Sequence, residues 1–412
     1  MASSPDRSIV IVGASLTGAK AAERLRESGF DGSIVLIGAE SELPYERPPL
    51  SKEYLLGKAE RSSARVHDEA WYSDNQVDLR LGVTVTSIDP DGHSVETDGG
   101  ERIGFSRLLL ATGSSPRKLD VPGAELDGVL YLRRIEDSDR LREVFGKGGR
   151  IVVVGAGWIG LETAAAAREH GCEVTIVEPQ PAPLRAALGD ELGNWFGDVH
   201  RKHGVDLRLG TGVERITGDR SATGVVTGDG TELPADAVVV GVGIAPNVEL
   251  AERAGLTVDN GVVVDARLAT SHPDVYAAGD VANSFVPRYG RHVRVEHWAN
   301  ALNGGPAAAR AMLGEDVSYD RIPYFFTDQY DVGMEFSGWF PPGGYDEVVL
   351  RGSPDDGAFY SFWLSGGRVV AGMHVNQWDD GVTPVEALID SGKVIDKQRL
   401  TDTSVPLGEV AG

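Results

Sequence analysis

A glycine pattern in the middle of the chain has the spacing of a turn that binds a pyrophosphate. Gly155, Gly157 and Gly160 follow an apolar run in RIVVVGAGWIGLE and precede an alanine-rich stretch. Where such a turn joins a strand to a helix, backbone N–H groups at the helix N-terminus can bind the phosphates. Glu178 ends the next apolar run, where an acid can accept hydrogen bonds from ribose hydroxyls. The pattern therefore predicts a dinucleotide site.

A related pattern stands near the start of the chain, in IVIVGASLTGAK. Gly13 and Gly18 hold the outer positions, and Ser15 replaces the middle glycine. Serine is small enough to be tolerated where the backbone approaches a pyrophosphate, and its hydroxyl can add a contact. Glu40 follows the next apolar run, as an acid that binds a ribose should. Together the two patterns predict two dinucleotides, of which FAD and a nicotinamide are the obvious pair.

The nicotinamide cofactor is expected to be NADH, because the carboxylate of Glu178 would repel the 2′-phosphate of NADPH. Arg185 stands a short distance further along the chain and could still reach a phosphate. The use of NADPH therefore stays open at this point.

Each glycine turn needs a strand before it and a helix after it. We expect strands over 8–12 and 33–37, with a helix between them that stops at Gly29. Other strands are expected to end in small-residue turns, each of which is either a cofactor contact or a plain connection. These turns are Ala111-Thr112-Gly113, Gly241 to Asn247, and Ala278-Gly279 before Asp280.

The composition restricts the class of protein. The 412 residues carry a formal net charge of −23, which argues against sequence-independent binding to nucleic acid, because such binding needs a basic surface. No apolar stretch approaches the ~20 residues that span a bilayer, and the first residues do not resemble a signal peptide. Cys172 is the single cysteine and excludes an intrachain disulfide. We therefore expect a cytoplasmic protein that binds neither membranes nor nucleic acid.

The order of the motifs GxSxxG, RPPLSK, ATG, GAGWIGLE, GVGIAPN and YAAGD resembles the flavoprotein pyridine-nucleotide reductases. The motif RPPLSK narrows the resemblance to the ferredoxin reductases of bacterial oxygenase systems. The resemblance implies an α/β fold with two Rossmann-like dinucleotide-binding domains, arranged as in glutathione reductase, and a C-terminal α+β domain. It implies an FAD domain over 1–113 and 247–318, an NAD domain over 114–246 and a C-terminal domain over 319–412. In the last, we expect a hairpin turning at Gly366-Gly367 and a helix over 383–392.

The resemblance also implies which residues contact the cofactors. The positions that match FAD contacts of the family are Ser15, Thr17, Glu40, Arg47, Pro48, Lys52, Val85, Arg133, Asp280 and Trp298. Neighbouring positions and the turns complete the candidate cofactor set with Gly13, Gly18, Ala111, Thr112, Gly113, Gly155, Gly157, Ile159, Gly160, Glu178, Gly243, Gly279, Glu296, His297 and Phe326. His297 could equally be a packed or solvated histidine. Some relatives have tryptophan at the position of Phe326. Phenylalanine keeps a stacking surface there but lacks the indole N–H.

The stretch YERPPLSKEY contains the catalytic candidate Lys52. We expect Ser51 to cap a short helix that runs to Leu56 and ends at Gly57. This would place Lys52 in the first helical turn, where the helix dipole disfavours a cation. The resemblance implies that Lys52 lies near the flavin N5 and pairs with the second catalytic candidate, Glu162, from another domain. The alternative is a surface lysine that never meets Glu162.

The reaction implied by the resemblance is hydride transfer from NADH to FAD, followed by transfer of single electrons to a [2Fe–2S] ferredoxin that serves a monooxygenase or dioxygenase. A rubredoxin reductase, a monodehydroascorbate-type reductase and an apoptosis-inducing-factor-like redox or signalling protein are the alternatives. Disulfide reductases need a cysteine pair beside the flavin, and the single cysteine, Cys172, is expected to be a core residue. The nine histidines show no metal-binding spacing, so we expect no metal site.

A basic cluster, RYGRHVR, stands out in this acidic chain. Arg288, Arg291 and Arg294 could dock an acidic ferredoxin, because charges at the rim of an interface set the association rate. The alternative is an ordinary solvated loop. The sequence leaves open whether the protein is a monomer or a homodimer.

Overall fold

The computed structural model describes residues 7–411, which form two compact units, each assembled from three segments of the chain. Unit 1 contains the residues through Glu46, together with Arg61–Ser115 and Ile244–Pro323. Unit 2 contains Arg47–Glu60, Pro116–Gly243 and the residues from Tyr324 onward. Two of the points where the chain passes between the units lie in or directly before a short strand, β8 (Ser114–Pro116) and β17 (Ile244–Pro246).

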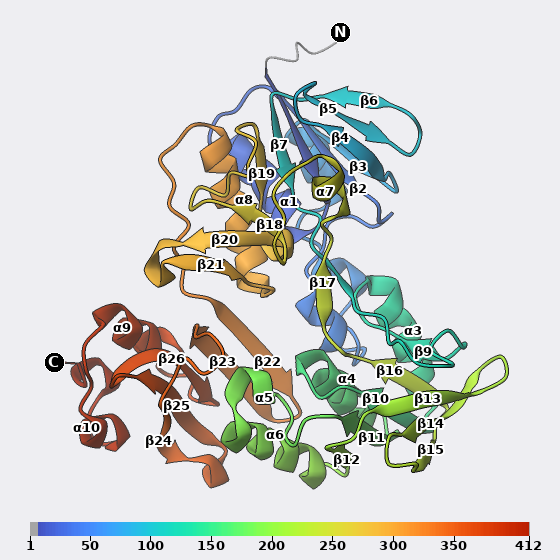
Figure 1. Cartoon of the computed structure of the whole chain (residues 1–412), viewed down its shortest axis with the longest axis vertical. Helices are drawn as coiled ribbons and strands as arrows, with labels where there is room; N and C mark the ends of the chain where they lie inside the picture. Colours follow the sequence, from blue (N-terminus) through green and yellow to red (C-terminus); the bar gives the residue numbers. More distant parts are fainter. Residues whose placement is uncertain (1–6, 412) are drawn as a thin grey trace. The chain divides into compact units, whose positions relative to one another are not determined.

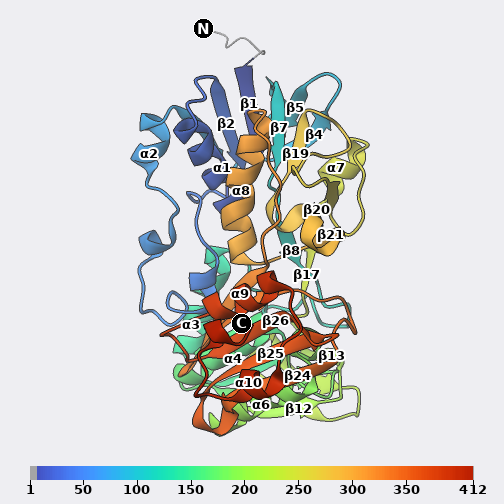
Figure 2. The ribbon, with the colours of Figure 1, turned by 90° about the vertical axis from the view of Figure 1, so that its left-hand side faces the viewer.

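Unit 1 is built on a parallel five-stranded sheet. Its strands, in spatial order, are β19 (Val275–Ala277), β7 (Arg107–Leu110), β1 (Ser8–Val12), β2 (Ser33–Gly38) and β3 (Val77–Leu81). The residues of β1 are buried along its whole length, as expected for a strand covered on both faces. Helices α1 (Leu16–Glu27) and α8 (Trp298–Met312) lie side by side in this unit (Figure 2).

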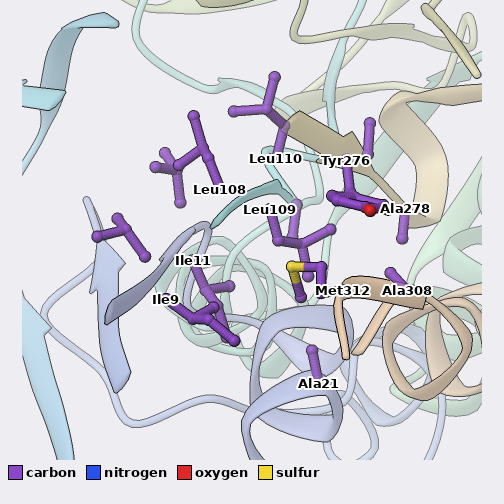
Figure 3. Packing of buried hydrophobic residues seen from close by; sticks show 14 of the residues in the cluster. Ile9, Ile11, Ala21, Leu108, Leu109, Leu110, Tyr276, Ala278, Ala308 and Met312 are labelled. Atoms are coloured by element: carbon purple, nitrogen blue, oxygen red, sulfur yellow. The ribbon is translucent and has the colours of Figure 1, made fainter. Parts of the chain in front are cut away.

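The core of unit 1 lies between the sheet and these two helices. Figure 3 shows Ile9 and Ile11 of β1, Leu109 of β7, and Ala21 and Met312 of the two helices among its buried residues. Two small three-stranded sheets, the first antiparallel and the second mixed, and two short helices complete the unit. They are β4 (Val85–Asp89), β5 (Ser94–Thr97) and β6 (Arg102–Gly104), then β18 (Val262–Val264), β20 (Ala282–Val286) and β21 (Arg291–Arg294), with α2 (Glu69–Asp74) and α7 (Glu249–Arg253).

Unit 2 contains a second parallel five-stranded sheet, labelled in Figure 1. Its order is β12 (Asp206–Leu209), β11 (Glu173–Glu178), β10 (Arg150–Val154), β16 (Ala237–Val240) and β9 (Val129–Leu130). Its helices are α3 (Ile135–Gly146), α4 (Trp158–Glu169), α5 (Arg185–Leu188) and α6 (Asp190–Lys202). A small antiparallel sheet is formed by β13 (Val213–Gly218), β14 (Ala222–Thr227) and β15 (Glu232–Pro234).

The C-terminal part of unit 2 is an antiparallel five-stranded sheet with two helices (Figures 1 and 2). Its strands, in spatial order, are β22 (Tyr324–Gln329), β23 (Val332–Gly338), β26 (Arg368–Val375), β25 (Ala358–Ser365) and β24 (Glu347–Ser353). Helix α9 (Thr383–Ser391) packs on β26, and α10 (Lys397–Thr401) lies near β24. The expected hairpin at Gly366-Gly367 and the expected helix are both present.

The expected fold class is confirmed, because each unit contains a parallel sheet with helices and the C-terminal part mixes an antiparallel sheet with helices. The strand, turn, helix and strand order predicted around both glycine patterns is also present. Across residues 7–411, the structure contains no helix with both the length and the apolar character needed to cross a bilayer.

Candidate active site

The glycine turn of unit 1 brings three backbone segments into close contact. Gly13 has φ +122°, and a Cβ at this position would lie 2.0 Å from the carbonyl oxygen of Ala111. A Cβ at Gly18 would lie 2.1 Å from the carbonyl oxygen of Gly13. Only glycine fits either position. Ser15 directly precedes α1, so the turn places backbone N–H groups of the helix N-terminus where a pyrophosphate would bind.

The glycine turn of unit 2 has the same construction. A Cβ at Gly155 would lie 2.4 Å from the carbonyl oxygen of Gly241, and one at Gly160 would lie 2.1 Å from that of Gly155. A Cβ at Gly157 would meet open space, with no atom of the described chain within 4 Å outside its direct neighbours. The outer glycines therefore serve the packing of the turn, whereas the middle one leaves its outer face accessible to a ligand. Both turns fit a dinucleotide.

Glu178 lies beside the second turn. One carboxylate oxygen accepts a hydrogen bond from the Ala156 N–H at 2.8 Å, and the other accepts one from the Gln180 N–H at 2.8 Å. Arg185 is held nearby, because its Nη1 donates to the side-chain oxygen of Gln180 at 3.3 Å. Its Nε donates to Asp190 at 2.5 Å, and this hydrogen bond raises the pKa of the guanidinium. Arg185 is thus already paired with a carboxylate.

The other small-residue turns of unit 1 are joined by polar contacts. The hydroxyl of Thr112 donates to the carbonyl of Asn247 at 2.9 Å, and the Asn247 amide donates back to the carbonyl of Thr112 at 2.8 Å. Ser114 donates to the carboxylate of Asp280 at 2.7 Å. A Cβ at Gly279 would lie 2.6 Å from the hydroxyl oxygen of Thr17. These turns follow β7 and β19 and therefore lie at the same edge of the sheet as the first glycine turn.

Helix α8 begins beside this edge. The indole Nε1 of Trp298, its first residue, donates to the carboxylate of Glu46 at 2.8 Å. Glu296 forms an ion pair with Arg294. Burial lowers the pKa of His297 to about 4, although the charge of Asp280 opposes this shift. His297 is therefore a neutral imidazole at neutral pH.

The other FAD candidates are Glu40 and Val85 in unit 1 and several residues in unit 2. Glu40 accepts a hydrogen bond from the hydroxyl of Tyr45 at 2.5 Å. Val85 is buried in the core of unit 1. The remaining FAD candidates belong to unit 2 and are Arg47, Pro48, Lys52, Arg133 and Phe326. Of these, Arg47 donates through its guanidinium to the carbonyl of Arg133. The nicotinamide candidates belong to the same unit.

The structure corrects the expectation for the stretch around Lys52. The segment Pro48–Ser51 is a 3₁₀ helix that begins at the two prolines, and Lys52 directly follows its last residue. Proline suits the first positions of a helix because its φ is already helical. Ser51 therefore ends this helix, and the helix expected from Ser51 to Leu56 is replaced by turns. A cation is favoured at a helix C-terminus, so the position of Lys52 breaks no local rule.

The predicted pair of Lys52 and Glu162 is present and buried. The Lys52 Nζ lies 2.8 Å from Glu162 Oε1, and the side chains are 9% and 4% exposed. The hydroxyl of Thr327 donates to the same Oε1 at 2.6 Å, and the hydroxyl of Ser51 donates to Oε2. Lys52 Nζ also lies 5.3 Å from the ring centroid of Phe326, within the range of a cation–π interaction. The alternative of a surface lysine that never meets Glu162 is wrong.

Sequence reasoning missed two partners of Glu162. Ser51 adjoins Lys52, but it was expected to cap a helix. Thr327 lies on β22, which is far from Glu162 in sequence, so no local pattern could indicate the contact. No group of three or more histidine, cysteine, aspartate or glutamate side chains is arranged to hold a metal ion within residues 7–411.

The basic cluster of unit 1 divides into two parts. Arg288 and Arg291 are exposed. The side chain of Arg294 is only 11% exposed and is paired with Glu296. The cluster is a short 3₁₀ turn followed by β21 rather than an irregular loop, and Arg294 is the last residue of that strand.

Comparisons with known proteins cover nearly all of the chain. Residues 7–305 match the pyridine nucleotide-disulphide oxidoreductase family, and residues 324–411 match the reductase C-terminal family. The chain is 41% identical over 402 residues to the ferredoxin–NAD(+) reductase component of the anthranilate 1,2-dioxygenase system of Burkholderia cepacia, covering 97% of this chain and 98% of that protein. It is 37% identical to putidaredoxin reductase of Pseudomonas putida, covering 98% and 96% of the two chains.

A solved structure agrees with these matches. The reductase in the covalent putidaredoxin reductase–putidaredoxin complex superposes with a TM-score of 0.94 at 36% identity, covering 99% of this chain and 98% of that one. The family name refers to disulphides, but this chain has a single cysteine and cannot form a redox-active pair of its own. Both glycine turns and the C-terminal sheet lie within the matched regions. The chain belongs to the pyridine nucleotide-disulphide oxidoreductase family and, within it, to the ferredoxin–NAD(+) reductases of oxygenase systems.

Proposed function

We propose that this protein transfers electrons from NADH through FAD to a [2Fe–2S] ferredoxin, which serves a monooxygenase or dioxygenase. The observation that carries this proposal is the presence of two glycine turns built for dinucleotides in a chain whose single cysteine is buried. Two dinucleotides without a cysteine pair allow electrons to enter as a hydride and to leave toward an outside acceptor. The names of the relatives point to a ferredoxin as that acceptor.

FAD is assigned to unit 1. When bound, FAD accepts a hydride and releases electrons singly. The turn around Gly13 would bind its pyrophosphate, Glu40 a ribose hydroxyl and Asp280 the ribityl chain. Trp298 would place the N-terminus of α8 beneath the pyrimidine end of the flavin, where the positive end of the helix dipole stabilises negative charge. His297 stays neutral there, because burial lowers its pKa to about 4.

The nicotinamide cofactor is assigned to the glycine turn of unit 2. Glu178 would accept hydrogen bonds from the adenosine ribose and disfavour a 2′-phosphate. Arg185 is the side chain that could bind such a phosphate, but Asp190 already neutralises it. Both features favour NADH.

Lys52 and Glu162 are assigned to the step in which NADH reduces the flavin. A buried ion pair fixes the position of a cation much better than an exposed one does, since side chains in the interior have little freedom. We infer that Lys52 orients the reacting edge of the flavin and that Glu162 holds Lys52 in place. The 3₁₀ helix directly before Lys52 limits the movement of its backbone.

The ferredoxin would dock at the basic surface formed by Arg288 and Arg291, because both arginines are exposed in an otherwise acidic protein. The reaction is assigned to the cytoplasm, where a protein without disulfides is stable.

Rapid mixing of the FAD-loaded protein with NADH or NADPH tests the proposal. We expect the flavin absorbance to bleach faster with NADH. A ferredoxin should then be required for rapid reduction of cytochrome c. Rapid reduction with a rubredoxin in place of the ferredoxin would instead identify a rubredoxin reductase. A flavin that NADH does not bleach would rule out both.

A further inference from the structure

A buried chain of hydrogen bonds connects α6 to Glu162. His200 Nε2 lies 2.9 Å from the side-chain oxygen of Gln329, whose Nε2 donates to Thr327 Oγ1 at 3.1 Å. Thr327 in turn donates to Glu162 Oε1 at 2.6 Å. At the other end, the hydroxyl of Tyr330 lies 3.2 Å from His200 Nδ1. We call Tyr330, His200, Gln329 and Thr327 the donor chain, and all its members except Tyr330 are buried.

The donors of this chain all point toward Glu162. Gln329 uses an N–H toward Thr327, which leaves the single proton of the Thr327 hydroxyl for the carboxylate. The side-chain oxygen of Gln329 can only accept, so the proton of His200 lies on Nε2 and its Nδ1 accepts from Tyr330. Burial lowers the pKa of His200 to about 4, so the imidazole is neutral and can donate and accept at once.

This arrangement does more than satisfy buried polar groups. An ion pair alone sets the distance between two charges but leaves a carboxylate able to rotate about its last bond, because that torsion is broad. Thr327 binds the same oxygen as Lys52 does, and Ser51 binds the other oxygen. In a chain of hydrogen bonds that all have the same donor-to-acceptor direction, as here, each bond polarises the next.

We propose that the donor chain positions the Glu162 carboxylate so that its Oε1 stays bound to Lys52. The members of the chain are positioning residues, since none is assigned to contact a cofactor. The inference rests on the proposed role of Lys52 and Glu162 in the reduction of the flavin by NADH.

Thr327→Val tests the proposal, because it removes the hydroxyl and keeps the shape of the side chain. Thr227→Val is the matched control. Thr227 is also a strand residue, is as buried as Thr327, and donates to the carboxylate of Asp229 at 2.6 Å. We expect the limiting rate of flavin reduction by NADH to fall about tenfold in Thr327→Val. The dissociation constant of NADH should change less than about twofold, and Thr227→Val should keep both values.

Two further variants separate positioning from a loss of stability. Thr327→Ser keeps the hydroxyl and should restore the rate, even though it leaves a small cavity. Gln329→Met removes the donor to Thr327 and should slow the reaction less than Thr327→Val does, by about threefold. Equal rates in Thr327→Val and Thr227→Val would overturn the inference, as would a failure of Thr327→Ser to restore the rate. A wild-type protein that NADH does not reduce would instead overturn the proposed function.

Discussion

Lys52 and Glu162 form an ion pair whose atoms lie 2.8 Å apart and whose side chains are almost completely buried. A second pair joins the same two segments of the chain, because Lys58 lies 3.0 Å from Glu169 further along α4. That second pair is exposed, with 62% of the lysine side chain accessible. The two pairs therefore differ mainly in burial, so the exposed pair of Lys58 and Glu169 serves as a control for substitutions in the buried pair.

Lys52→Met should slow the reduction of the flavin by NADH and also destabilise the protein. The substitution leaves the Glu162 carboxylate buried without its cation, which costs about 3 kcal/mol of unfolding free energy. Lys58→Met should cost at most about 1 kcal/mol, because exposed ion pairs contribute little. Rapid-mixing kinetics and urea unfolding measure the two effects. An unchanged bleaching rate in Lys52→Met would remove Lys52 from the reaction.

Asp190→Ala should increase the use of NADPH. The substitution releases Arg185, which then can bind a 2′-phosphate beside Glu178. We expect the ratio of kcat/KM for NADPH to that for NADH to rise about threefold to tenfold, since the new contact is exposed and is opposed by the carboxylate of Glu178.

The control for this prediction is Asp198→Ala. Asp198 belongs to the same helix, α6, and is paired with Arg201 at 2.8 Å. This control variant should keep the preference of the wild type. If both variants change the ratio equally, the effect comes from net charge rather than from Arg185.

His200 should make the protein less stable in acid. Its pKa is about 4 in the folded protein and about 6.5 in the unfolded chain. Below about pH 6.5 the unfolded state therefore binds a proton that the folded state does not, and stability falls by about 1.4 kcal/mol per pH unit until about pH 4. This loss of stability amounts to about 3 kcal/mol in total and does not occur above about pH 6.5.

His200→Gln should remove this dependence. The variant should be less stable at pH 7, because it loses buried hydrogen bonds, but its stability should fall less steeply between pH 6.5 and pH 4. Urea unfolding over this pH range measures both slopes. Parallel slopes for the variant and the wild type would show that His200 is not the titrating group.

Replacement of Arg288 and Arg291 by alanine should slow the reduction of ferredoxin at low salt, by about tenfold, because exposed charges steer association. The difference from the wild type should shrink at high salt, where the charges are screened. Arg253 and Arg267 are exposed arginines elsewhere in unit 1, and their joint replacement changes the net charge equally. A similar loss in both double variants would mean that the ferredoxin does not dock at Arg288 and Arg291.

The sequence was sufficient for features that depend on neighbouring residues. The glycine turns and the position of Glu178 were predicted because each requires a strand, a turn and a helix in succession. The pairing of Lys52 with Glu162 joins distant segments, so it needed the resemblance to a known family. Local propensity failed at Ser51, where the 3₁₀ helix begun by the two preceding prolines prevented the expected cap.

The donor chain could not be predicted from the sequence at all. Its residues come from α6, β22 and the turn that follows β22, and none of them stands in a motif. His200 and Thr327 each look like an ordinary residue of an amphipathic helix or strand. Only the packing of α6 against the C-terminal sheet brings them into one network with Glu162.

Cys172 has a practical consequence. The thiol is buried, its sulfur lies 3.5 Å from the carbonyl oxygen of Phe145, and burial raises its pKa. Such a thiol reacts slowly with alkylating reagents and oxidants. A cysteine introduced on the surface would therefore be the one readily labelled position. Fluorescent dyes, spin labels or electrode tethers could thus be attached at a chosen site without first replacing a native residue.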